Sequence, residues 1–236
     1  MSTKRMELTG RATITNGLGA PQLIPRVEPM NIEVSLTNLR AGIRVFKVRK
    51  WPADFHAGLY ARQAKQRAGG LTEHWWSETV DDLGLWLATR PLSKADVRER
   101  GLMALSRLNS AYDQLPRVGT EFGEIGWSSL SRLFDVACSI KPTLRPSPVF
   151  PSKLCHFLRP DLYVVVDRAV VRLLGPYPDV WAACSKAWRH ARPIHDELRH
   201  LLAQSATESL PSTYPFGTKI TELCVIGTKA RARKTP

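Results

Sequence analysis

The spacing of apolar residues between positions 51 and 226 is the feature that most limits the fold. Within residues 93–115, apolar side chains stand at Val97, Leu102, Leu105, Leu108 and Tyr112. Residues with this period line one face of a helix, and that face must be buried against other helices. The pattern recurs, bounded by Gly and Pro, in residues 52–68, 72–89, 128–140, 179–191, 194–202 and 216–226. We therefore expect a mainly α-helical protein.

The first fifty residues lack this period. Residues 32–36 and 43–48 are rich in residues that favour strands, and Gly, Pro and Asn occupy turn positions. We expect an irregular or short-stranded N-terminal extension over residues 1–50. Residues 51–228 then form the helical domain, either undivided or as two subdomains with a cleft between them, and residues 229–236 form a C-terminal tail.

Positive charge is concentrated at the two ends of the sequence. The chain of 236 residues has 34 Lys+Arg and 21 Asp+Glu, a formal net charge of +13. Residues 1–50 hold nine basic and three acidic residues, and the last eight hold four basic residues and no acidic ones. Concentrated basic residues favour a polyanionic partner, because each neutralised phosphate releases counterions. This indicates nucleic acid, and the alternative is a solubilising tail with a solvated face.

Other classes of protein find less support. No apolar run follows the basic residues at the start, and the longest compact one, residues 162–166, is too short to span a bilayer. We expect a cytoplasmic monomer that does not bind membranes. Four widely spaced cysteines read as reduced core residues: Cys138, Cys155, Cys184 and Cys224. No spacing of His or Cys suits a metal, and no phosphate-binding or dinucleotide motif occurs, so we expect no metal and no cofactor.

The segment 151–170 carries the candidate chemistry. A predicted short helix starts at Ser152 and bears Lys153 in its first turn, an extended apolar link follows at 162–166, and Asp167 begins the next predicted helix, residues 167–174. A carboxylate can stabilise the positive charge that develops on a sugar when its N-glycosidic bond breaks. A lysine with a lowered pKa can attack C1′ of that sugar. The structural alternatives are an N-cap for Asp167 and a surface lysine for Lys153.

This segment resembles the catalytic region of the helix-hairpin-helix DNA glycosylase superfamily. The resemblance implies that family's helical fold, with Asp167 as the essential aspartate and Lys153 as the nucleophile of members that also act as abasic-site lyases. The usual hairpin signature Leu-Pro-Gly-Val-Gly does not precede Lys153. This departure suggests an unusual substrate, for example a hypermodified base of bacteriophage DNA, and hence a role in antiviral defence.

A glycosylase flips its target base into a pocket and holds the surrounding phosphates. The candidates for the base pocket are Trp75, Trp76, His156 and Phe157. The candidates for contacts with DNA are Arg44, Lys47, Arg168 and Lys219. For each of the aromatic residues the alternative is core packing, and for each of the basic residues it is a solvent-facing side chain.

The sequence thus favours a DNA glycosylase that removes a modified base from double-stranded DNA and leaves an abasic site. The alternative is a non-catalytic basic DNA-binding protein on the same scaffold, which would bind in a salt-dependent way without cleaving the DNA. A third hypothesis is a helical interaction protein with an incidental positive charge, which would not bind DNA even at low salt.

Overall fold

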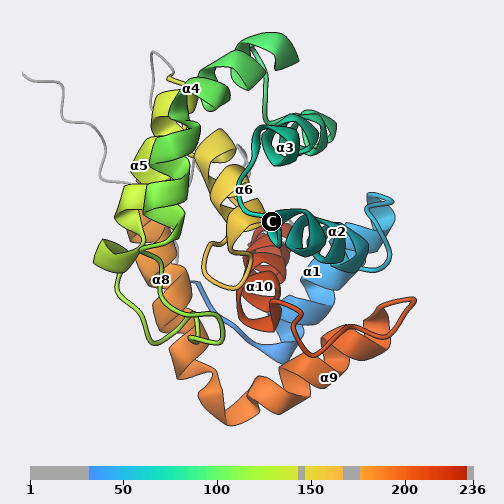
Figure 1. The fold of residues 1–236 in the computed structure, drawn as a ribbon. Coiled ribbons are helices and arrows are strands. Elements are labelled where there is room, and N and C mark those ends of the chain that lie inside the picture. The colour runs from blue at the N-terminus through green and yellow to red at the C-terminus, as the bar shows by residue number, and fades with distance from the viewer. Residues whose placement is uncertain (1–31, 143–146, 167–175, 233–236) are drawn as a thin grey trace, which may run out of the picture.

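The structure, a computed structural model, describes residues 32–142, 147–166 and 176–232. Within these ranges all regular structure is helical, which confirms the mainly α prediction (Figure 1). The helices are α1 (Leu36–Val48), α2 (Ala57–Arg67), α3 (Glu73–Leu85), α4 (Lys94–Tyr112), α5 (Ser131–Ile140), α6 (Val149–Leu158), α8 (Tyr177–His190), α9 (His195–Ser205) and α10 (Phe216–Ala232). Short 3-10 helices cover Trp127–Ser129 and Arg192–Ile194. The predicted helix 167–174 lies outside the described residues.

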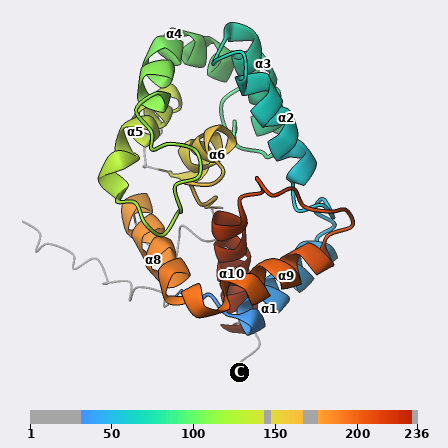
Figure 2. The ribbon, with the colours of Figure 1, turned by 60° about the horizontal axis from the view of Figure 1, so that its bottom comes forward.

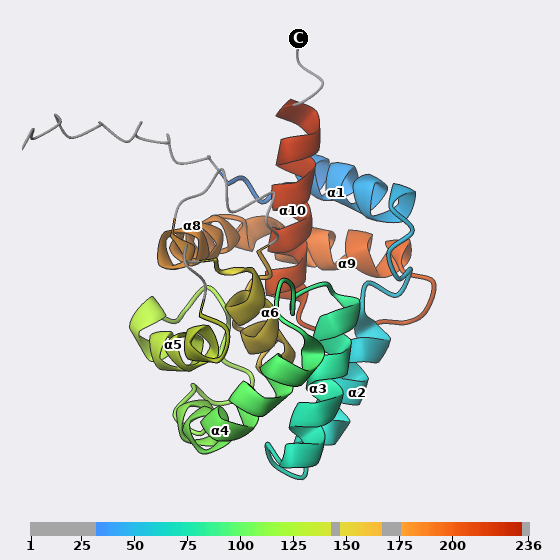
Figure 3. The same ribbon diagram turned by 90° about the horizontal axis from the view of Figure 1, so that it is seen from above.

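Helix α6 lies at the centre of the molecule. Figure 2 shows it inside a ring of the other helices, and Figure 3 shows it between α10 on one side and α3, α4 and α5 on the other. Every residue of α6 from Phe150 to Leu158 is buried. Burial of a polar group is unfavourable unless it is hydrogen-bonded. The polar residues Ser152, Lys153 and His156 must therefore find their partners inside the protein.

The prediction of short strands at 32–36 and 43–48 is wrong. Ser35 caps α1 by accepting a hydrogen bond from the backbone N–H of Asn38, and Leu39, Ile43 and Phe46 then fall on one buried face. This face packs against α10, where Gly42 and Gly227 let the two backbones approach closely. Tertiary packing thus overrides the strand preference of the β-branched residues. Residues 32–50 belong to the helical body, and α10 continues through residues 229–232.

Helix α6 begins earlier than the sequence suggested. Its first residue is Val149, with Pro148 as the N-cap, whereas we expected Ser152 to cap it. Pro151 fits in the first turn because the backbone N–H that proline lacks would have no helical partner there. Lys153 consequently lies in the second turn, buried, and is not a lysine at an exposed helix end.

None of the helices in the described ranges is long and apolar enough to cross a membrane. The four cysteines are free thiols on α5, α6, α8 and α10, and Cys155, Cys184 and Cys224 are fully enclosed. Burial raises the pKa of the Cys184 thiol to about 12, so this group stays protonated at neutral pH. These cysteines pack as small apolar residues.

Candidate active site

Lys153 lies in the centre of the fold with a side chain that is held in place. The residue is 9% exposed, and its Nζ donates a hydrogen bond of 2.7 Å to the backbone carbonyl of Trp86. The same Nζ lies 5.8 Å from the centroid of the Trp86 ring. Trp86 is the C-cap of α3 and is partly exposed. The amine is therefore fixed at the boundary between the core and an accessible aromatic side chain.

A second lysine makes a comparable contact with the same loop. Lys141, just after α5, donates to the carbonyls of Ala88 and Arg90. Burial lowers the pKa of Lys141, and the positive charge of Lys153 lowers it further. Two amines thus hold the loop that joins α3 to α4. A variant of Lys141 can therefore serve as the control for a variant of Lys153, because both remove a buried amine from the same loop.

The apolar link after α6 returns the chain to the neighbourhood of Lys153. Residues 163–166 contain no helix, and the backbone N–H of Val166 donates to Oγ of Ser152 at 3.3 Å. Two side chains of α8 hold the link: Tyr177 donates to the carbonyl of Val164, and Trp181 donates to that of Leu162. The two predicted residues that follow Val166, Asp167 and Arg168, lie outside the described residues.

The predicted roles of Trp75 and Trp76 in a base pocket are not supported by their positions. Both side chains are almost fully buried between α3 and α4, and Nε1 of Trp76 donates to the carbonyl of Arg98 at 2.8 Å. The Trp76 ring packs directly on Gly101, where an added Cβ would lie 1.8 Å from the ring. These residues are part of the core, as the structural alternative stated.

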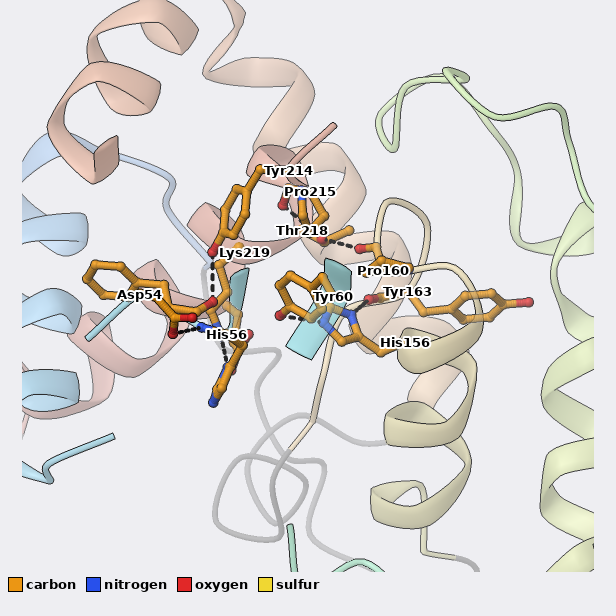
Figure 4. A network of polar contacts seen from close by, with 12 residues as sticks. Asp54, His56, Tyr60, His156, Pro160, Tyr163, Tyr214, Pro215, Thr218 and Lys219 are labelled. Atoms are coloured by element: carbon orange, nitrogen blue, oxygen red, sulfur yellow. Dashed lines mark hydrogen bonds and ion pairs between the residues drawn. The ribbon is translucent and has the colours of Figure 1, made fainter. Parts of the chain in front are cut away.

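His156 and Phe157 are also enclosed. His156 Nδ1 donates to the carbonyl of Tyr163 at 2.5 Å, and its Nε2 accepts from the hydroxyl of Tyr60 at 2.8 Å (Figure 4). Burial lowers the pKa of His156 to about 3, against the opposing effect of the bond to Tyr163. Phe157 packs edge-on against Trp86. The neutral imidazole therefore joins α2, α6 and the apolar link, and neither residue faces an open site.

Lys219 is not placed to contact phosphate. It is fully buried on α10, where its Nζ donates to Oε2 of Glu222 at 2.9 Å and to Nδ1 of His56 at 3.2 Å. The amine also lies 5.1 Å from the centroid of the Phe46 ring. Burial of this charge with a carboxylate partner gives it a role inside the protein. The position of Lys219 therefore does not favour the predicted contact with DNA.

Arg44 and Lys47 are exposed, as a role in binding DNA requires. They lie on the outer face of α1 together with Arg40, at positions i, i+4 and i+7 of the helix, and thus form one row of positive charge. Residues at these spacings share a helix face. We call Arg40, Arg44 and Lys47 the basic row.

His56 and Trp86 form the part of the site that the sequence did not reveal. Their rings lie 4.7 Å apart, beside the carbonyl that holds Lys153. Burial and the nearby charge of Lys219 lower the pKa of His56 to about 2, with smaller effects from His156 and Lys153. A single histidine and a tryptophan flanked by leucines have no motif spacing. Only the folded arrangement brings them to Lys153.

A cavity of about 840 Å³ lies elsewhere, at the C-terminal end of α6. Its walls are α2 and the segments 118–122, 159–161 and 211–217. Two of its arginines are ion-paired: Arg159 with Asp161 at 2.6 Å, and Arg199 with Glu121 at 3.3 Å. These pairs compensate the positive charge of both arginines, so the cavity is less suited to a phosphate than the exposed basic row.

In the described ranges no three His, Cys, Asp or Glu side chains are grouped in a way that would hold a metal ion. Comparisons of the chain with protein-family models, with curated proteins and with solved structures find no match.

Proposed function

We propose that the protein is a DNA glycosylase in which Lys153 attacks C1′ of the nucleotide whose base is removed. The observation that carries the proposal is the buried amine of Lys153, fixed 2.7 Å from the Trp86 carbonyl and adjoining a partly exposed indole. An amine fixed at the edge of the core beside an accessible indole is positioned to act as a nucleophile on a substrate that reaches that indole. Double-stranded DNA that contains a modified base is the proposed substrate.

Water is the only reagent that the reaction needs besides Lys153 and the DNA. The lone pair of Nζ forms a bond to C1′ while the N-glycosidic bond breaks, and the base leaves with that bonding pair and takes up a proton. The C1′–O4′ bond then breaks as the lone pair of the nitrogen forms a C=N bond, and O4′ takes the bonding pair and a proton, which leaves an iminium between the sugar and Lys153. Asp167, the aspartate of the motif, would stabilise the positive charge on the sugar. Hydrolysis of the iminium returns the amine and an abasic site.

The proposal is tested by trapping the iminium with borohydride on a duplex with a preformed abasic site. Lys153→Ala should abolish the covalent complex, because it removes the amine that forms the iminium. Lys141→Ala should keep it, although loss of two buried hydrogen bonds should destabilise the fold by about 1–3 kcal/mol. A Lys153→Ala variant that still forms the complex, or a wild type that forms none, would overturn the nucleophile assignment.

The exposed basic row favours a second candidate, a DNA-binding protein without catalysis. Each contact between a cation and a phosphate steepens the dependence of log K on log salt by about 0.9. Removing Arg44 and Lys47 together should therefore reduce the slope by up to about 2, with Lys186→Ala, an exposed change on α8, as the control. Equal slopes for both proteins would show that DNA does not contact the row. Binding of this kind without base release or trapping on any duplex would establish the non-catalytic alternative.

A further inference from the structure

His56 is held in a backbone conformation that few residues adopt. Phe55 and His56 both have positive φ angles, 50° and 70°. The carboxylate of Asp54 stabilises this turn by accepting the backbone N–H groups of His56 at 3.0 Å and Gly58 at 2.9 Å. A non-glycine residue in this region costs on the order of 1–3 kcal/mol, and such residues are concentrated at functional sites. The turn directs the imidazole across to α10 (Figure 4).

The contact with α10 fixes which nitrogen of His56 carries the proton. The ammonium of Lys219 can only donate, so Nδ1 of His56 accepts this hydrogen bond and the proton of the neutral ring lies on Nε2. The low pKa of His56, about 2, keeps the ring neutral at physiological pH. Lys219 thus makes His56 Nε2 a permanent donor.

The same lysine orients Glu222. Its Nζ binds Oε2 of that carboxylate, and the side chain of Glu222 is 14% exposed. Among the residues that the structure describes, neither Nε2 of His56 nor Oε1 of Glu222 has a hydrogen-bond partner, and both residues are only partly buried. Polar atoms at this depth usually have a partner, and a ligand that offers an acceptor to Nε2 and an N–H group to Oε1 would satisfy both.

Of the two groups, His56 adjoins Lys153 through Trp86. The ring of Trp86 lies 4.7 Å from the His56 ring, and the backbone carbonyl of Trp86 lies 2.7 Å from Nζ of Lys153. A ligand at the amine that also contacted the indole would therefore meet His56. The edge of a nucleobase presents a hydrogen-bond acceptor beside an N–H donor, whereas deoxyribose and phosphate offer no such pair on a flat, stacking surface.

We infer that His56 and Glu222 recognise the flipped base, with Nε2 of His56 donating to an acceptor on its edge and Oε1 of Glu222 accepting an N–H group. Trp86 supplies the apolar contact. Lys219 is a positioning residue that sets the orientation of both groups and does not touch DNA. This inference rests on the proposed function, because it assigns the base to the site of Lys153.

Two substrates separate base recognition from lysine chemistry. The first is a duplex with a preformed abasic site, which needs Lys153 but has no base to recognise. The second is a set of duplexes of the same sequence, each with one uracil, hypoxanthine, 8-oxoguanine, 5-hydroxymethyluracil or glucosylated 5-hydroxymethylcytosine. Borohydride trapping is measured on the first, and release of the base on the second.

His56→Phe keeps a ring beside Trp86 but removes the donor. It should lower kcat/KM for base release by roughly 10- to 100-fold, the effect of one lost hydrogen bond to a substrate, and should leave abasic-site trapping within about twofold of wild type. His56→Gln restores a donor and should recover part of the loss. His74 on α3 has a side chain that is 82% exposed, so His74→Phe is the matched control and should change neither activity. Melting temperatures of all variants identify any failure to fold.

The outcomes are distinct. Equal losses of base release and trapping in His56→Phe, or no loss of either, would overturn base recognition by His56. So would a wild type that traps abasic DNA but releases no base from any duplex. A wild type that does neither would overturn the proposed function itself, whereas loss of base release alone in His56→Phe, with recovery in His56→Gln, supports the inference.

Discussion

A Gly42→Val variant should not fold. Helices α1 and α10 cross at this residue so closely that a Cβ on Gly42 would lie 1.9 Å from the backbone carbonyl oxygen of Leu223. A flexible side chain could move away, but a helical backbone cannot without separating the two helices and opening the core. We expect a loss of more than about 4 kcal/mol, a large part of the total stability of a domain. The measurement is circular dichroism during thermal unfolding.

The control for this variant is Gly69→Ala. An added Cβ at Gly69 has no neighbour within 4 Å, so we expect a change in melting temperature of no more than a few degrees. Gly227→Ala tests the same crossing from the other helix, since its Cβ would lie 2.0 Å from the carbonyl oxygen of Asn38. Wild-type melting temperatures for the variants at 42 and 227 would mean that α1 and α10 pack farther apart.

This crossing also shows where the sequence was informative and where it was not. Most of the helices that the structure describes after residue 52 were predictable, because their apolar faces repeat with the helical period and because Ser93 and Thr72 cap α4 and α3. Helix α1 was missed because Ile43, Val45 and Val48 favour strands locally. Its helical state depends on burial against α10, which is about 180 residues away in sequence, and no local pattern reports such a contact.

The candidate site was predictable only in part. Lys153 became a candidate because of the sequence around it, whereas its second-turn position and the contact with Trp86 depend on tertiary structure. Trp76 and Lys219 were predicted to face DNA, but both side chains are buried, and one reason accounts for both differences. Residue type indicates which interactions a side chain can make, but burial decides whether a ligand can contact it. Aromatic residues and paired lysines occur both in cores and on binding surfaces, so their type alone does not distinguish the two.

Acidification should destabilise the protein well before its carboxylates are protonated. The pKa of His156 is lowered from 6.5 to about 3, and that of His56 to about 2, so both rings stay neutral in the folded state. In the unfolded chain each would take up a proton near pH 6.5. Below that pH the unfolded state binds more protons, and the free energy of unfolding falls as pH falls, by about 1.4 kcal/mol per pH unit for each histidine. Above pH 6.5 this contribution is fully present and constant.

The measurement is the midpoint of urea unfolding between pH 7.5 and 4.5, a range in which few carboxylates titrate. His156→Gln removes one of the two buried rings, so it should lower stability at pH 7.5 but also reduce the slope below pH 6.5 by about half. His74→Gln changes an exposed histidine and should leave the wild-type slope. A slope that stays at the wild-type value in His156→Gln would mean that this imidazole becomes protonated inside the folded protein. The bond from Tyr60 would then be lost first, since a protonated Nε2 cannot accept it.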